Sequence, residues 1–74
     1  MDYWLFDEID ATFKPKRGDD LQEGVRGFVG RRFRWRAAWM IEEGPYAGQF
    51  AWLPLDNDAR VIGWVPTEDL EVKR

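Results

Sequence analysis

The sequence predicts an all-β domain, arranged as a small barrel or roll of five short strands. Apolar and polar residues alternate with a period of two wherever a pattern can be read, which is typical of half-buried strands. Gly, Pro, Asn and Asp gather between the alternating stretches, as expected for short turns. No stretch requires a helix longer than a single turn. The 74 residues contain no repeat and no linker, so we expect one domain over 1–74.

The first predicted strand carries Ile9, Ala11 and Phe13 on one face and ends at Pro15, which cannot continue a ladder. A long loop follows over residues 15–30, because 16–20 have turn-forming residues and three glycines punctuate the remainder. Four apolar side chains could anchor this loop to the core: Leu21, Val25, Phe28 and Val29.

The clearest strand covers residues 32–41, where two sets of side chains alternate. The set expected to face the core is Phe33, Trp35, Ala37, Trp39 and Ile41. The opposite face is basic at one end, with Arg32, Arg34 and Arg36. A third strand is expected over 49–55, with an edge or a bulge at Pro54 because proline lacks an N–H group.

The remaining chain predicts a hairpin turn over 56–59, a fourth strand over 60–65, a single turn over 66–69 and a closing strand over 70–72. Within the fourth strand, Ile62 and Trp64 would share one face, and Val61 and Val65 the other. Only one of these sets can fill the core, and the pattern leaves both choices open.

Composition limits the possible functions. Five Trp, five Phe and two Tyr predict a largely aromatic core, which a chain this short needs because it buries only about 60 to 65% of its unfolded surface. Cys and His are absent, so thiolate nucleophiles, imidazole bases, disulfides and the usual zinc ligands are excluded. We therefore expect no enzyme activity and no cofactor. The acidic N-terminal residues and short apolar runs predict a cytoplasmic protein that is neither secreted nor membrane-spanning.

Two segments resemble SH3-like barrels. Gly63-Trp64-Val65-Pro66, followed by a turn and a short strand, resembles the closing segment of SH3 domains. The resemblance implies a barrel in which the proline lies on a shelf for proline-rich peptides. This chain departs from the family at Glu68 and Asp69, which stand where SH3 domains carry Asn and Tyr.

The second likeness is at Gly44-Pro45-Tyr46-Ala47-Gly48, which is similar to the turn between two strands of KOW modules. That family has the same barrel type, and its members bind ribosomal RNA or RNA polymerase. The later glycine of the family pattern is missing from the residues that follow, Gln49 to Trp52. Both resemblances imply a small five-stranded SH3-like barrel, and each covers only about ten residues.

The candidate ligand-binding residues are Arg32, Arg34, Arg36, Tyr46 and Trp64. Arginines two apart on a strand point the same way at about 6.5 to 7 Å, a spacing that suits successive phosphates or carboxylates. Carboxylates on neighbouring strands could instead pair with them, leaving an ordinary solvated face. The aromatic residues could form part of an exposed groove or simply fill the core.

These features predict a non-catalytic protein or peptide interaction module, whose partner would be an acidic segment facing the arginines. The long loop over 15–30 and the turn over 44–48 are expected to present side chains beside this arginine face. Nucleic-acid binding through the same arginines, with Tyr46 or a tryptophan stacking on bases, is the alternative. A third hypothesis is an assembly role, including a homo-oligomer, in which Tyr3, Trp4 and Phe6 contact a partner. The acidic N-terminal residues could also fold onto the arginine face and mask it. No metal site is expected.

Overall fold

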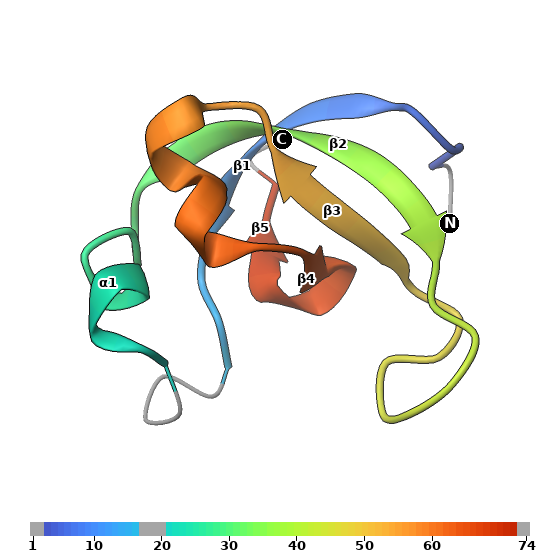
Figure 1. Cartoon of the computed structure of the whole chain (residues 1–74). Helices are drawn as coiled ribbons and strands as arrows, with labels where there is room; N and C mark the ends of the chain where they lie inside the picture. The colour runs from blue at the N-terminus through green and yellow to red at the C-terminus, as the bar shows by residue number, and fades with distance from the viewer. Residues whose placement is uncertain (1–2, 17–20, 73–74) are drawn as a thin grey trace.

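The structure is a computed structural model that describes residues 3–16 and 21–72. Its single antiparallel sheet has the strand order β4-β3-β2-β1-β5 and curls into a nearly closed barrel (Figure 1). The strands are β1 (Glu8–Phe13), β2 (Arg32–Met40), β3 (Phe50–Pro54), β4 (Val65–Pro66) and β5 (Leu70–Glu71). The predicted all-β class and the five-stranded barrel are therefore confirmed.

Among the described residues, three short helical segments connect the strands: α1 (Glu23–Arg26), η2 (Asn57–Ile62) and η3 (Thr67–Asp69). None of the helices in the described part of the chain has the length and apolar character needed to cross a membrane.

The core is aromatic, as the composition predicts. Phe13, Trp35 and Trp52 are the largest fully buried side chains. Both buried indoles have a hydrogen-bond acceptor, as burial of a polar N–H group requires. The Nε1–H group of Trp35 donates to the carbonyl of Ala11 at 3.0 Å, and that of Trp52 donates to the Thr67 hydroxyl at 2.8 Å.

A β-bulge in β2 overturns the predicted place of Trp39. Ala37 pairs with Trp52 and Trp39 pairs with Ala51, so Ala38 is an extra residue in the ladder. One extra residue reverses the faces of the side chains that follow it. Trp39 therefore shares the face of Ala51 rather than that of Trp52, and it is 43% exposed instead of filling the core.

The hairpin turn over 56–59 and the strand over 60–65 are wrong, because most of this stretch forms η2. Asp56 caps the helix by accepting a hydrogen bond from the N–H group of Asp58 at 2.9 Å. Ala59 is buried against the core, and Gly63, with φ of 73°, ends the helix. Only Val65–Pro66 remains as a strand.

The described part of the expected long loop, 15–16 and 21–30, holds the helical turn α1 and is anchored from inside as predicted. Val25 is buried, and Leu21 and Phe28 pack against the core. Val29 is exposed and does not serve as an anchor. The turn predicted at 16–20 lies outside the described residues except for its first member.

Candidate binding surfaces

The arginine stripe lies on the exposed face of β2, beside β1. Arg34 Nη2 lies 3.2 Å from Glu8 Oε1, and Arg32 Nη2 lies 4.0 Å from Asp10 Oδ2. Each arginine reaches diagonally to a carboxylate on the neighbouring strand rather than to its direct register partner. The side chains are about half exposed, so solvent screens these pairs and each contributes little stability.

The third arginine is in a different environment. The Arg36 guanidinium lies 5.9 Å from the centre of the Phe6 ring, and no described carboxylate forms an ion pair with it. Glu8 belongs to β1, so its contact with Arg34 is a cross-strand ion pair of the kind expected for an ordinary solvated face. Asp2 lies outside the described residues, and Asp7 instead accepts a hydrogen bond from the N–H group of Trp4 at 2.8 Å.

Tyr46 and Trp64 line an open groove of about 370 Å³, which we call the Tyr46–Trp64 groove. One wall comes from the long segment before and within α1, including Pro15 and Leu21. The opposite side comes from the turn that carries Tyr46 and from the stretch that leads into β4, where Trp64 and Pro66 lie. The lining is mostly apolar, with Gln22 and Asp69 as its polar members.

The turn that holds Tyr46 is closed by its backbone. The N–H group of Gly48 donates to the carbonyl of Ile41, and the N–H group of Ile41 donates to the carbonyl of Gln49, both at 2.9 Å. Gly44 and Gly48 each have φ of 90°, a conformation that residues with a side chain rarely adopt. The spacing of these glycines therefore has a conformational cause, and it positions Tyr46 between them.

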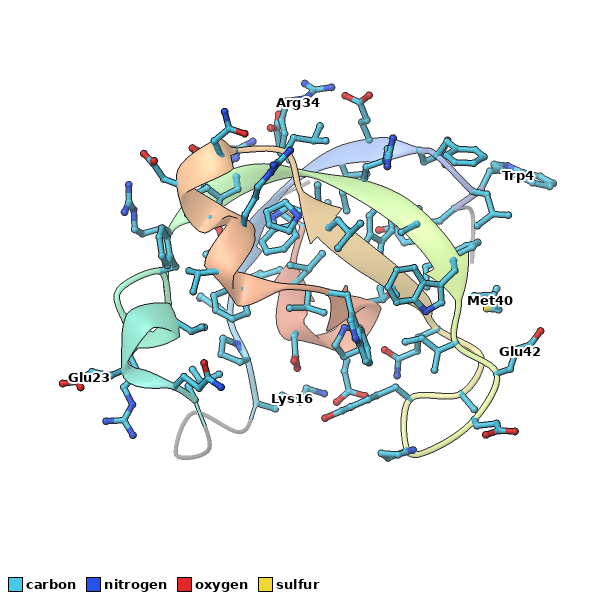
Figure 2. All side chains as sticks on the ribbon, in the orientation of Figure 1. Trp4, Lys16, Glu23, Arg34, Met40 and Glu42 are labelled. Atoms are coloured by element: carbon cyan, nitrogen blue, oxygen red, sulfur yellow. The ribbon has the colours of Figure 1, made fainter. Side chains whose placement is uncertain are left out.

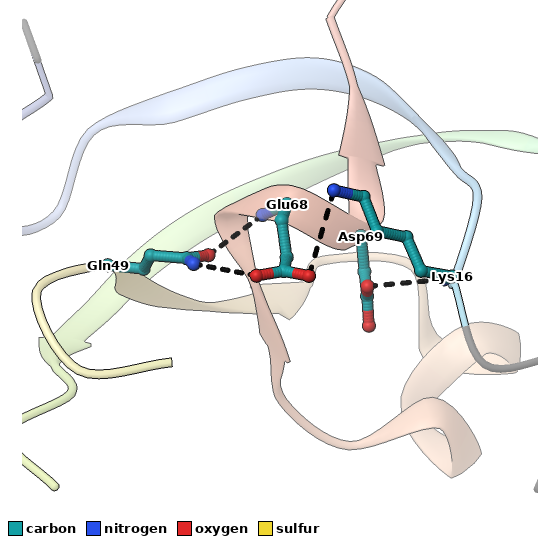
Figure 3. A network of polar contacts seen from close by, with 4 residues as sticks. All are labelled: Lys16, Gln49, Glu68 and Asp69. Carbon is teal, nitrogen blue, oxygen red and sulfur yellow. Dashed lines mark hydrogen bonds and ion pairs between the residues drawn. The ribbon is translucent and has the colours of Figure 1, made fainter. Parts of the chain in front are cut away.

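A polar network fastens the two sides of the groove together (Figure 3). Gln49 and Glu68 form a reciprocal pair: the Gln49 amide donates to Glu68 Oε1 at 2.8 Å and accepts from the Glu68 N–H group at 3.0 Å. Lys16 joins them, with its Nζ 3.8 Å from Glu68 Oε2 and its N–H group 3.4 Å from Asp69 Oδ1. The network thus links the long segment, the end of the Tyr46 turn and η3.

Trp64 separates this groove from a second, shallower hollow. Its ring packs against Trp39 in a T-shaped arrangement, with ring centres 5.9 Å apart and an interplanar angle of 62°. The second hollow is lined by both tryptophans and by residues 40–43, which include Glu42 and Glu43. Trp64 itself is 44% exposed. Neither of the two sets expected from alternation fills the core as a whole, because most of this stretch forms η2. Val65 is buried and Ile62 packs against the core, whereas Val61 and Trp64 are exposed.

The five predicted site residues therefore divide between two surfaces. Tyr46 and Trp64 share the groove, whereas none of the three arginines lines it. We expected the long loop and the Tyr46 turn to lie beside the arginine face, and this was wrong. Arg34 and Lys16, at the edge of the groove, lie at opposite ends of the view in Figure 2.

Sequence reasoning missed two residues of these surfaces. Trp39 was assigned to the core because nothing in the local alternation marks the bulge. Arg60 was placed on a strand, whereas it lies on η2 and lines a hollow together with Arg36. The Asp-Asn-Asp run at 56–58 was the available signal for η2, since such residues cap helices as readily as they form turns.

No protein-family model, no curated protein and no solved structure matches this chain.

Proposed function

We propose that this chain is a non-catalytic peptide-interaction module of the SH3-like type, and that the Tyr46–Trp64 groove is its binding site. The observation that carries the proposal is the groove itself. Trp64 is exposed and Tyr46 and Pro15 are half-buried, and these rigid side chains lose little conformational entropy when a partner covers them. The polar network of Figure 3 further supports a preformed site.

The charge around the groove suggests which peptide it binds. The groove lining includes Asp69, the adjoining hollow includes Glu42 and Glu43, and neither lining contains an arginine or a lysine. This surface is complementary to an extended segment that places apolar residues in the groove and a cationic residue beside Trp64. The acidic partner expected from the arginine stripe does not match the groove.

The resemblance to SH3 domains supports the same site. Pro66 occupies the position of the family's shelf proline, and it lines the groove together with Trp64. Asp69, at the position of the family's Tyr, contributes a carboxylate where the family offers a ring. We therefore propose a groove that depends more on charge than a typical proline-binding shelf.

Selection from a random peptide display library tests the proposal. We expect enrichment of peptides that combine apolar or proline residues with Lys or Arg. Binding of these peptides should weaken at least about tenfold in Tyr46→Ala or Trp64→Ala, the loss typical of a central aromatic contact. Trp4→Ala removes a tryptophan that is 75% exposed and outside the groove lining, so it should leave binding unchanged. Equal losses in Trp4→Ala and Trp64→Ala, or no enriched peptide, would refute the proposal.

Nucleic-acid binding was the alternative, and two observations count against it. Arg32 and Arg34 lie within ion-pair distance of carboxylates, and Tyr46 and Trp64 line a groove that the arginines do not line. Titration with labelled single- and double-stranded DNA and RNA is the appropriate second arm. Binding that survives physiological salt and disappears when Arg32, Arg34 and Arg36 are replaced by Gln would establish the alternative instead.

An assembly role is supported by a separate feature, the N-terminal turn. Trp4, Leu5 and Phe6 are exposed, and Phe6 has φ of 71°, a costly conformation for an aromatic residue. Tyr3, by contrast, packs on Trp52 with ring centres 5.1 Å apart, so deleting the segment would also damage the core. Replacing only Trp4, Leu5 and Phe6 by Ser is the cleaner test. A concentration-dependent sedimentation mass that these changes abolish would support assembly.

A further inference from the structure

A further hollow of about 500 Å³, distinct from the one beside Trp39 and Trp64, lies between β2, the end of β3 and η2, and we call it the Arg36–Arg60 hollow. It is lined by Arg36, Leu53, Pro54, Leu55, Arg60 and Gly63. None of these residues lines the Tyr46–Trp64 groove, so the two sites can be tested separately.

The floor of the hollow is apolar because of the register of β3. Leu53 lies opposite Arg36 in the β2–β3 ladder, and Leu55 continues the same face two residues later. The N–H group of Leu55 donates to the carbonyl of Arg34 at 2.9 Å, which holds the end of β3 against β2. Leu53 remains half-buried and Leu55 is exposed, so both can contact a partner.

The rim of the hollow is cationic and carries no carboxylate. Arg60 projects from η2 and Arg36 from β2, and within the described residues neither has an ion-pair partner. This differs from Arg32 and Arg34, which lie within ion-pair distance of Asp10 and Glu8. The Phe6 ring lies near Arg36 without providing an acceptor for its N–H groups, so those donors stay available to a carboxylate.

We propose that the Arg36–Arg60 hollow binds an acidic segment of another protein, in which an apolar side chain lies between carboxylates. The apolar side chain would cover Leu53 and Leu55 while the carboxylates accept hydrogen bonds from the two guanidinium groups. A nucleic acid fits less well, because a sugar-phosphate backbone offers no apolar side chain to cover Leu53 and Leu55.

The test uses a seven-residue probe peptide in which Leu and Phe lie between two runs of Asp and Glu. NMR titration of the full chain should show saturable shifts of the Arg36 and Arg60 Nε–H signals and of the Leu55 methyl groups. The double variant Arg36→Gln/Arg60→Gln should weaken binding at least about tenfold, since two charge-assisted contacts are lost. Leu55→Ser should weaken it about threefold or more with every charge intact.

A matched control removes the same charge elsewhere. Arg26→Gln/Arg31→Gln changes two exposed arginines that do not line the hollow. It should leave affinity for the probe within about twofold, as expected for screened charges at a distance. Trp64→Ala should also bind the probe normally, which separates this proposal from the one for the groove.

Three results would overturn the proposal. Equal weakening of peptide binding in both double arginine variants would show that the loss comes from general electrostatics and not from this site. The absence of saturable shifts at millimolar peptide would show that no such site exists. A single-stranded oligonucleotide could bind more tightly than the peptide. If Arg36→Gln/Arg60→Gln abolished that binding, the hollow would be assigned to nucleic acid.

Discussion

Replacement of Thr67 by Val removes a hydroxyl group that makes two hydrogen bonds, one with the Trp52 indole and one with the Phe50 carbonyl. The Nε1–H group of Trp52 donates to Thr67 Oγ1 at 2.8 Å, and the Thr67 hydroxyl donates to the carbonyl of Phe50 at 3.3 Å. Trp52 is fully buried, so its N–H group has no water to replace the lost acceptor. Val has nearly the same shape, and the change therefore tests the hydrogen bond rather than the packing.

The expected loss of unfolding free energy follows from leaving a buried donor unsatisfied. Such a group costs about 1 to 3 kcal/mol, and we take about 2 kcal/mol for this indole. In a domain of this length each kcal/mol lowers the Tm by about 4 to 8 °C, so the Tm should fall by about 8 to 16 °C.

Thermal and urea unfolding followed by circular dichroism measure this loss, and Thr67→Ser is the matched control. Ser keeps the hydroxyl group and lacks one methyl group, so it should cost no more than about 1 kcal/mol. The reasoning would be refuted if Thr67→Val stayed within about 0.5 kcal/mol of the parent chain, or if the Ser variant lost as much as the Val variant.

Three further changes test other parts of the structure. Gly48→Ala should lower the free energy of unfolding by about 1 to 3 kcal/mol, because φ of 90° strains a residue with a side chain. Gly27→Ala, at φ of −64°, should be neutral or slightly stabilising, and equal urea midpoints for the two variants would contradict this. Tyr3→Ala removes an edge-on contact with a buried tryptophan and should lower the Tm clearly, whereas Trp4→Ser should change stability by less than about 0.5 kcal/mol. Glu8→Gln breaks an exposed ion pair and should lower the free energy of unfolding by less than about 1 kcal/mol, and this difference should vanish in 1 M salt. A larger or salt-independent loss would show that the pair contributes substantially to the stability of the fold.

Local patterns predicted much of the fold. Alternation placed Ala11 and Phe13 in the core, and it placed Phe33 and Trp35 on the buried face of β2 with the arginines outside. These predictions hold because the side chains of a strand alternate whatever the strand pairs with. The glycines around Tyr46 likewise predicted a turn, since their conformational freedom is a local property.

The errors have a non-local origin. The bulge at Ala38 depends on how β2 fits β3, and it turned Trp39 outward. Similarly, a turn was predicted over 56–59 and a strand over 60–65, yet residues 57–62 form η2, where Ala59 and Ile62 pack against the core. Tertiary packing outweighs the weak intrinsic preference of so short a segment.

The sequence by itself determined the strand-forming stretches, the aromatic core and the chemical types at the surface, because these follow from side-chain chemistry and a period of two. Only the tertiary structure decided how the surface residues are grouped. It brought Tyr46 together with Trp64, paired Arg32 and Arg34 with carboxylates, and set Arg36 beside Arg60. The physical reason is that barrel closure joins segments far apart in the chain, and no local pattern specifies which side chains then become neighbours.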